Sequence, residues 1–214
     1  MRIAMINGSP KLGKSNSSIL LTALEGLISN EHEIARYSLN KRPLTPEQYS
    51  ELCRMDTLIL AFPLYVDGIP SHLFRMLVAL EEYMKSERQH DIYVYVMVNN
   101  GFYEGKQNHI AIEIIKNWCA RSGLHFGQAV GQGAGEMMGL IEKIPLGHGP
   151  LKNLGNAMLA LADNIQTHSS GESVLINPNF PRFAWRFMGT HSFWNATAKK
   201  NGLKRKDILR RNIN

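Results

Sequence analysis

The chain has 214 residues, of which 44% are hydrophobic and 20% charged, so it can build one sizeable core but is short for two full domains. The formal net charge of +6 is unevenly spread. Residues 180–214 hold nine basic residues and one acidic residue, whereas residues 1–179 hold 15 basic and 17 acidic residues. This distribution argues against a nucleic-acid-binding surface over the whole chain and defines a basic tail.

Cysteine usage and hydropathy point to a reducing compartment. Cys53 and Cys119 are the only cysteines and lie far apart, each in a helix-like segment, which predicts buried, inert thiols rather than an iron–sulfur cluster. The first apolar run is too short for a signal peptide, and no apolar stretch approaches a membrane span. We therefore expect a cytoplasmic protein. The eight histidines lack paired ligand spacing, so no metal site is predicted.

Short apolar runs alternate with amphipathic segments along the chain. In chain order the predicted elements are strand 3–7, helix 19–27, edge strand 32–39, helix 47–55, strand 57–62, helix 72–84, strand 91–98, helix 108–123, strand 125–131 and helix 151–165. Five repeats of strand then helix predict an α/β fold, with a parallel sheet and helices on both faces. Ligands of such sheets bind beyond the carboxyl ends of the strands, so the loops after residues 7, 62, 98 and 131 should form the site.

The loop after the first strand, GSPKLGKS (8–15), matches the pattern G-x-x-x-x-G-K-[ST]. A nucleoside-triphosphate site would use Lys14 and Ser15 and would need a carboxylate at the end of another strand for magnesium, but no predicted strand ends in one. The alternative is a metal-free site for one phosphate monoester, with hydroxyl, amide and backbone N–H donors at the start of the helix. These donors would come from Ser9, Ser15, Asn16 and Ser17. A helix cap with nothing bound is a third interpretation.

The second loop lies in FPLYVDGIPSHLFRML (62–77) and combines a turn at Asp67-Gly68 with three consecutive apolar residues. A solvent-exposed connector gains nothing from Leu64, Tyr65 and Val66 in a row. Exposed apolar and aromatic groups at this edge of a sheet suit a flat aromatic ligand. A loop that folds back into the core remains the alternative.

These segments resemble the flavodoxin-like NAD(P)H-dependent FMN reductases. The resemblance rests on NGSPKLGKSNS (7–17), FPLYVDGIPSHLFRML (62–77), and NNGFYEGKQNHIAIEIIKNWCARSG (99–123) followed by GQGAG (131–135). It implies a flavodoxin-like three-layer sandwich with a five-stranded parallel sheet in the order 2-1-3-4-5. It also implies FMN as cofactor and NADH or NADPH as cosubstrate.

In that family the first loop grips the FMN phosphate, the second packs along the isoalloxazine ring and ribityl chain, and the third contacts the polar edge of the ring. The matching residues are Ser9, Lys11, Ser15, Asn16 and Ser17 in the first loop, Pro63, Leu64, Tyr65, Val66 and Gly68 in the second, and Asn99, Asn100, Gly101 and Phe102 in the third. Hydride transfer between nicotinamide and flavin needs no dedicated acid or base, so no catalytic residue is assigned. Tyr65 and Tyr103 could donate hydrogen bonds to a substrate.

The resemblance implies an FMN-dependent oxidoreductase that passes hydride from NAD(P)H to bound FMN and then reduces a small acceptor, such as a quinone, a nitro compound or free flavin. The alternative is a non-catalytic flavin- or phosphate-binding module, or an electron carrier, whose basic tail engages an anionic partner or a membrane surface. The nearly neutral charge of residues 1–179 favours a reductase over the acidic flavodoxin carriers.

We expect an FMN-binding domain over residues 1–170 and a basic, aromatic extension over residues 171–214. The extension contains too many aromatic residues for a disordered segment. They are Phe180, Phe183, Trp185, Phe187, Phe193 and Trp194. We expect the extension to dock on the protein with contacts in a homodimer, with peripheral membrane binding as the alternative. No nucleic-acid partner is expected, because no recognition motif is present.

Overall fold

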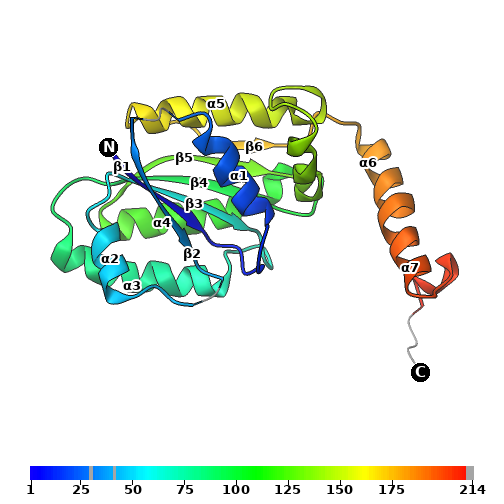
Figure 1. The fold of residues 1–214 in the computed structure, drawn as a ribbon, viewed down its shortest axis with the longest axis horizontal. Coiled ribbons are helices and arrows are strands. Elements are labelled where there is room, and N and C mark those ends of the chain that lie inside the picture. Colours follow the sequence, from blue (N-terminus) through cyan, green and yellow to red (C-terminus); the bar gives the residue numbers. More distant parts are fainter. Residues whose placement is uncertain (29–30, 41, 211–214) are drawn as a thin grey trace. The chain divides into compact units, whose positions relative to one another are not determined.

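The computed structural model describes residues 1–28, 31–40 and 42–210 (Figure 1). It divides into two compact units, Met1–Pro178 and Asn179–Asn214, and residues 211–214 of the second unit lie outside the described residues. Within the described residues, no helix combines the length and the apolar composition that a bilayer-spanning segment requires.

The first unit is a parallel sheet with helices on both faces (Figure 1). Its strands are β1 (Arg2–Asn7), β2 (Glu33–Ser38), β3 (Thr57–Pro63), β4 (Tyr93–Asn99), β5 (His125–Gln132) and β6 (Val174–Ile176). Its helices are α1 (Asn16–Glu25), α2 (Pro46–Leu52), α3 (Ser71–Glu87), α4 (His109–Ser122) and α5 (Lys152–Gln166). Side-chain caps start α1 and α2, and Gly123 ends α4 in the left-handed conformation, so local sequence sets these boundaries.

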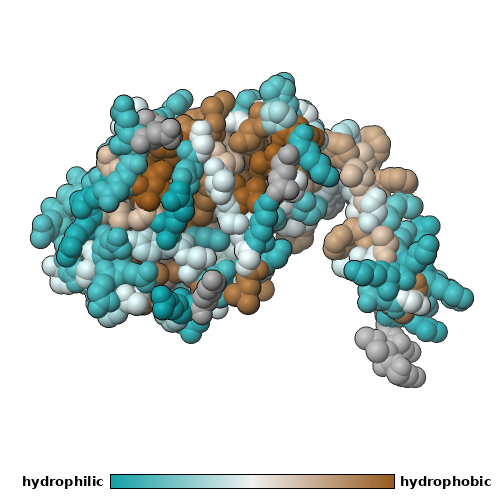
Figure 2. All heavy atoms as spheres, viewed as in Figure 1, coloured by the Kyte–Doolittle hydropathy of each residue, from teal (hydrophilic) through white to brown (hydrophobic). Residues whose placement is uncertain are grey.

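The second unit is a run of helical turns: α6 (Arg182–Met188), a π-helical segment (Gly189–Asn195) and α7 (Ala196–Lys200). A short 3₁₀ turn, Arg205–Asp207, follows. Figure 2 shows pale brown, apolar residues around α6 and hydrophilic residues beyond α7. The described residues of this unit are therefore mostly helical.

The prediction of a five-stranded sheet is wrong by one strand. The strand order is β2-β1-β3-β4-β5-β6, so the first five strands follow the expected order and Val174–Ile176 adds a sixth beside Val130–Gln132. This strand lies in the segment that the sequence assigned to the extension. Three residues are too few for a periodic pattern, so only the pairing with β5 identifies this strand.

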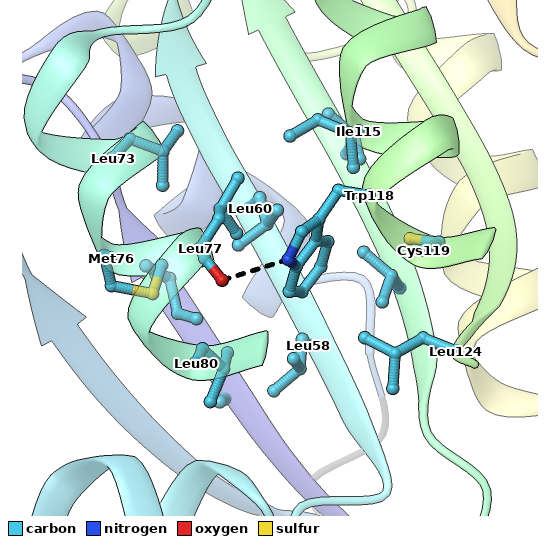
Figure 3. Packing of buried hydrophobic residues seen from close by; sticks show 14 of the residues in the cluster. Leu58, Leu60, Leu73, Met76, Leu77, Leu80, Ile115, Trp118, Cys119 and Leu124 are labelled. Atoms are coloured by element: carbon cyan, nitrogen blue, oxygen red, sulfur yellow. Dashed lines mark hydrogen bonds between the residues drawn. The ribbon is translucent and has the colours of Figure 1, made fainter. Parts of the chain in front are cut away.

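The core has one layer on each face of the sheet, and alternate residues of β3 supply both layers. Leu58, Leu60 and Phe62 pack with α2, α3 and α4, whereas Ile59 and Ala61 pack with α1 and α5. In the first layer the indole Nε1–H of Trp118 donates a hydrogen bond to the carbonyl of Leu77 at 3.0 Å, which ties α4 to α3 (Figure 3). The uninterrupted apolar run of β3 reflects this burial on both faces.

The two cysteines are free and buried, as the sequence predicts. Burial raises the pKa of the Cys53 thiol to about 11 and that of the Cys119 thiol to about 12, because the thiolate would lose its hydration. We expect neither thiol to react with an aromatic disulfide reagent in mildly alkaline buffer while the protein is native, and both to react after unfolding in guanidinium chloride. Rapid labelling of the native protein would contradict this burial.

Candidate functional site

The loops that follow β1, β3, β4 and β5 leave the sheet at one edge, because all strands run parallel (Figure 1). Pro63, Asn99 and Gln132 lie side by side in register at the ends of β3, β4 and β5. The four loops therefore meet at the carboxyl edge of the sheet, where ligands of open α/β sheets bind.

The first loop is folded by its own polar groups. The Oδ1 atom of Asn7 accepts the backbone N–H of Ser9 at 3.0 Å, and the Oγ atom of Ser9 accepts the backbone N–H of Lys11 at 3.3 Å. The carbonyl of Lys11 accepts a hydrogen bond from the side-chain amide of Asn40 at 2.7 Å, which holds the loop near the end of β2. The loop thus contains a buried hydroxyl, that of Ser9, and an exposed cation, that of Lys11.

The start of α1 combines a helix cap with unused donors. The Oγ atom of Ser15 accepts the backbone N–H of Ser18 at 3.1 Å, and the Oγ atom of Ser18 accepts the backbone N–H of Ser15 at 2.9 Å. Ser15 is thus a capping residue. The backbone N–H groups of Asn16 and Ser17 fall in the first turn, where the helix itself supplies no acceptor. Together with the positive end of the helix dipole, they can bind an anion.

Asn99 connects three of the loops. Its Nδ2 group donates to the Oγ atom of Ser17 at 3.3 Å and to the carbonyl of Phe62 at 3.2 Å. Its own carbonyl accepts the backbone N–H of Leu64 at 2.8 Å. Asn99 and Ser17 are both buried, so these hydrogen bonds are shielded from water. One amide side chain therefore holds the start of α1 and the ends of β3 and β4 together.

The fourth loop also contacts the residues around Asn99. It does so through a glycine that the sequence did not single out. The backbone N–H of Gly135 donates to the carbonyl of Asn100 at 2.6 Å. A Cβ atom at Gly135 would lie 2.8 Å from that carbonyl oxygen, 3.2 Å from Oδ1 of Asn99 and 3.4 Å from Nδ2 of Asn16. Only the run GQGAG (131–135) indicated such a close approach, and it did not show which glycine makes it.

The second loop is a tight hairpin turn. Tyr65 and Gly68 exchange two backbone hydrogen bonds of 3.0 Å, so the central residues of the turn are Val66 and Asp67, with φ angles of 48° and 56°. The turn thus lies one residue earlier than Asp67-Gly68. Leu64 packs against the core, whereas Tyr65 is half exposed and Val66 fully exposed. The apolar run is therefore divided between core and surface.

The conformation of Val66 leads to a stability prediction. A β-branched residue in the left-handed region is strained by about 1–3 kcal/mol, and this side chain is fully exposed. We expect Val66→Asn to increase the free energy of unfolding by about 1 kcal/mol in urea denaturation. The half-exposed Val78 of α3 provides the control, since Val78→Asn relieves no strain. A loss of stability in Val66→Asn would mean that the Val66 side chain is packed.

The third loop is stabilised by Asn100. Its Oδ1 atom accepts the backbone N–H of Phe102 at 2.8 Å, and its Nδ2 group donates to the carbonyl of Glu104 at 3.2 Å. Gly101 and Phe102 are exposed. The side chain of Asn100 therefore shapes the loop, and the residues that remain open to a ligand are Gly101 and Phe102.

The strands at this edge of the sheet end in uncharged residues. The strands that precede the four loops end in Asn7, Pro63, Asn99 and Gln132, none of which carries a carboxylate. In residues 1–28, 31–40 and 42–210, no three His, Cys, Asp or Glu side chains group so as to hold a metal ion. Burial lowers the pKa of His72, at the start of α3 beside Gly8, so this imidazole is neutral at physiological pH.

A separate groove of about 440 Å³ runs along α4, between His109, Phe126 and residues 170–175. The Nζ atom of Lys116 lies 2.7 Å from Oε1 of Glu113 and 5.5 Å from the centre of the Phe126 ring. Lys116 is thus paired with Glu113 within the groove. The groove contains none of the four loops, so we assign the candidate site to the loops at the carboxyl edge.

The order of the strands and the four loops define the first unit as an α/β protein of flavodoxin-like fold. No protein-family model matches the sequence, and no curated protein matches it. An NADH:FMN oxidoreductase in its apo form is 15% identical with a TM-score of 0.58, over 86% of this chain and 98% of that one. An NADPH-quinone reductase from P. pentosaceus is 14% identical with a TM-score of 0.57, over 79% and 100% of the two chains. An FMN-dependent NADH-azoreductase from Bacillus anthracis, in complex with FMN, is 16% identical with a TM-score of 0.51, over 78% and 100%.

Proposed function

We propose that the protein is an FMN-dependent oxidoreductase that takes hydride from NADH or NADPH and reduces a small acceptor such as a quinone, a nitro compound or free flavin. The observation that carries this proposal is the junction at Asn99, where a helix N-terminus with unused N–H groups meets a loop with exposed apolar side chains. A ligand that carries both a phosphate group and a flat aromatic ring can use the helix N-terminus for the phosphate and the apolar loop for the ring.

The donors at the first loop fit a phosphate monoester. The backbone N–H groups of Asn16 and Ser17, the hydroxyls of Ser9 and Ser17, and the exposed cation of Lys11 would hold its oxygens. Ser15 would act through the helix cap that orients this turn. The first loop (8–17) contains no carboxylate that would repel the phosphate, so a lone phosphate can be held there without a metal ion.

The remaining loops fit the ring. The exposed side chains of Tyr65 and Val66 and the backbone of Gly68 would pack along it, and Gly101 and Phe102 would contact its polar edge. The loops themselves would be held in place by the residues at the strand ends, Pro63, Leu64, Asn99 and Asn100. When bound, FMN would supply the two-electron chemistry. The chain's own part would be to orient the ring and to donate backbone N–H groups toward the charge of the reduced cofactor.

The similar solved structures support the proposal through their names, which describe NAD(P)H-dependent reductases, one of them in complex with FMN. The resemblance of the three loop sequences to FMN reductases supports it independently. We further propose that the enzyme acts in the cytoplasm as a homodimer and has no nucleic-acid partner.

The test begins with the visible absorption spectrum of the purified protein and the identification of any released flavin. We expect bound FMN, and oxidation of NADH or NADPH in the presence of a quinone or ferricyanide. A protein that binds FMN but shows no turnover would be a flavin-binding or electron-carrier module. A protein that fails to bind FMN but binds ATP with magnesium would overturn the proposal.

A further inference from the structure

The arm, residues 179–210, has a helical scaffold of its own. Its helical turns run without a break from Arg182 to Lys200, and the chain then folds back so that the N–H of Leu203 donates to the carbonyl of Ala198 at 2.9 Å. Ala198 is buried at this return. The arm therefore presents its other side chains on a defined backbone.

The first helix of the arm, α6, places a basic face beside an aromatic face. Its seven residues are two arginines and five apolar residues. Arg182 and Arg186 are four residues apart and share one face of this α-helix, and Phe183 and Phe187 share the neighbouring face. The phenyl rings are 78% and 62% exposed. Such a pairing of faces is typical of a helix that lies in a lipid–water interface.

Exposed apolar side chains continue beyond α6. They are both aromatic and aliphatic, and comprise Met188, Phe193, Trp194, Leu203 and Leu209. Phe193 meets Trp194 edge to face, with ring centres 5.2 Å apart, yet each side chain remains more than half exposed. Figure 2 shows this apolar surface around α6 and hydrophilic residues beyond α7. Exposed apolar surface of this extent marks an interaction site.

The charge of the arm calls for an anionic partner. Residues 180–214 carry nine basic residues against one acidic residue. All the basic residues within 180–210 are exposed. The acidic residue, Asp207, is used inside the arm, because its carboxylate accepts the backbone N–H of Lys204 at 2.9 Å and lies 3.9 Å from the guanidinium of Arg210. The exposed charge of the arm is therefore almost entirely positive.

An anionic lipid surface matches both properties of the arm. Nucleic acids offer phosphates to basic residues and bases to aromatic rings, but they offer no apolar surface to Met188, Leu203 and Leu209. A protein partner would need an acidic surface with a complementary pocket for each exposed ring. A bilayer with acidic headgroups offers negative charge and acyl chains along the whole arm and needs no shape complementarity.

We propose that the arm docks on the anionic surface of a lipid bilayer, with its apolar side chains at the boundary of headgroups and acyl chains and its basic side chains on the headgroups. No helix in the described part of the chain is long and apolar enough to cross a bilayer, so the arm would lie on the surface. The inference concerns the arm alone and holds whether or not the first unit binds FMN.

Co-sedimentation of the full chain with lipid vesicles tests this docking. We expect the protein to bind mixed phosphatidylserine–phosphatidylcholine vesicles at low salt, to be released at high salt, and not to bind vesicles of phosphatidylcholine alone. Phe187→Ser should weaken binding at least tenfold, because a buried phenyl ring is lost. Phe74→Ser, which makes the same change at a half-exposed position of α3, is the control and should bind like the wild-type protein.

A second pair of variants separates a local effect of charge from an effect of net charge. Lys199→Gln combined with Lys200→Gln should weaken binding more than tenfold, since each basic residue near an acidic bilayer contributes roughly a fivefold gain in affinity. Lys143→Gln combined with Lys152→Gln removes the same charge from exposed positions of the first unit and should have little effect. Circular dichroism verifies that each variant is folded.

The outcomes decide between the partners of the arm. A wild-type protein that stays in the supernatant at low salt would overturn the proposal. Equal losses in both lysine pairs, or full binding by Phe187→Ser, would also contradict it, because the arm would then not be the docking element. A protein that ignores vesicles but shifts a single-stranded oligonucleotide in a gel would identify nucleic acid as the partner instead.

Discussion

Replacing Ser17 by alanine should weaken FMN binding roughly tenfold to a hundredfold, because a hydrogen bond to a charged group contributes about 1.5–3 kcal/mol. Ser17 is buried in the first turn of α1, and its Oγ atom already accepts a hydrogen bond from Asn99 at 3.3 Å. Its hydroxyl proton is therefore directed to another acceptor, which we propose to be the phosphate. Titration of apoprotein with FMN, followed by quenching of flavin fluorescence, measures the change.

Two further variants make this result specific. Asn16→Ala should also weaken binding, because the Asn16 side chain lies close to Gly135 at the junction of the loops. Lys14→Ala should change the affinity much less, although Lys14 is central to the triphosphate pattern in GSPKLGKS. Thermal unfolding of the apoproteins separates lost affinity from lost stability. The reverse order of effects would show that this loop binds a triphosphate.

Replacing Gly133 by alanine should strongly destabilise the junction of the third and fourth loops. The new Cβ would lie 2.2 Å from the carbonyl oxygen of Tyr103 and 2.8 Å from the backbone nitrogen of Gly105. Both atoms belong to the main chain, so the third and fourth loops must move apart. Overpacking of this kind costs about 1–3 kcal/mol or more. The midpoint of thermal unfolding should fall by roughly 2–12 °C, since each kcal/mol shifts it by about 2–4 °C at this chain length.

Gly139→Ala is the matched control, because no heavy atom lies within 4 Å of the position that its Cβ would take. It should unfold at the wild-type temperature and bind FMN normally. Gly133→Ala should also lose FMN affinity, since displacement of the third loop moves Gly101 and Phe102. An unchanged unfolding midpoint for Gly133→Ala would contradict the close packing of the two loops.

Local sequence signals were sufficient for most of the first unit. The runs TLILAF and IYVYVMV are apolar at every position or nearly so, which identifies strands buried on both faces. The capping residue Ser15 and the left-handed Gly123 mark helix ends by short-range hydrogen bonds and backbone preference. The rule that loops of a parallel sheet meet at its carboxyl edge then located the candidate site before any contact was known.

Two features of the first unit did not follow from local sequence signals. Asp67-Gly68 is the stronger turn sequence, yet the turn centres on Val66 and Asp67, with a valine in a conformation that valine disfavours. The strand Val174–Ile176 is too short to be identified by its own pattern, and its pairing with β5 joins segments more than forty residues apart. The pairing energy of this strand therefore comes from a backbone segment distant in sequence rather than from local propensity.

By itself the sequence determined the α/β class, indicated the order of five strands by resemblance, and predicted which loops would supply the candidate site. Periodicity and capping act over a few residues and can be recognised in the chain. Only the tertiary structure decided how the loops are joined: Asn99 bridges Ser17 and Phe62, and Gly135 fits against Asn100 without a side chain. Hydrogen bonds and close approaches between residues distant in sequence leave no periodic trace, so they become visible only when the chain is folded.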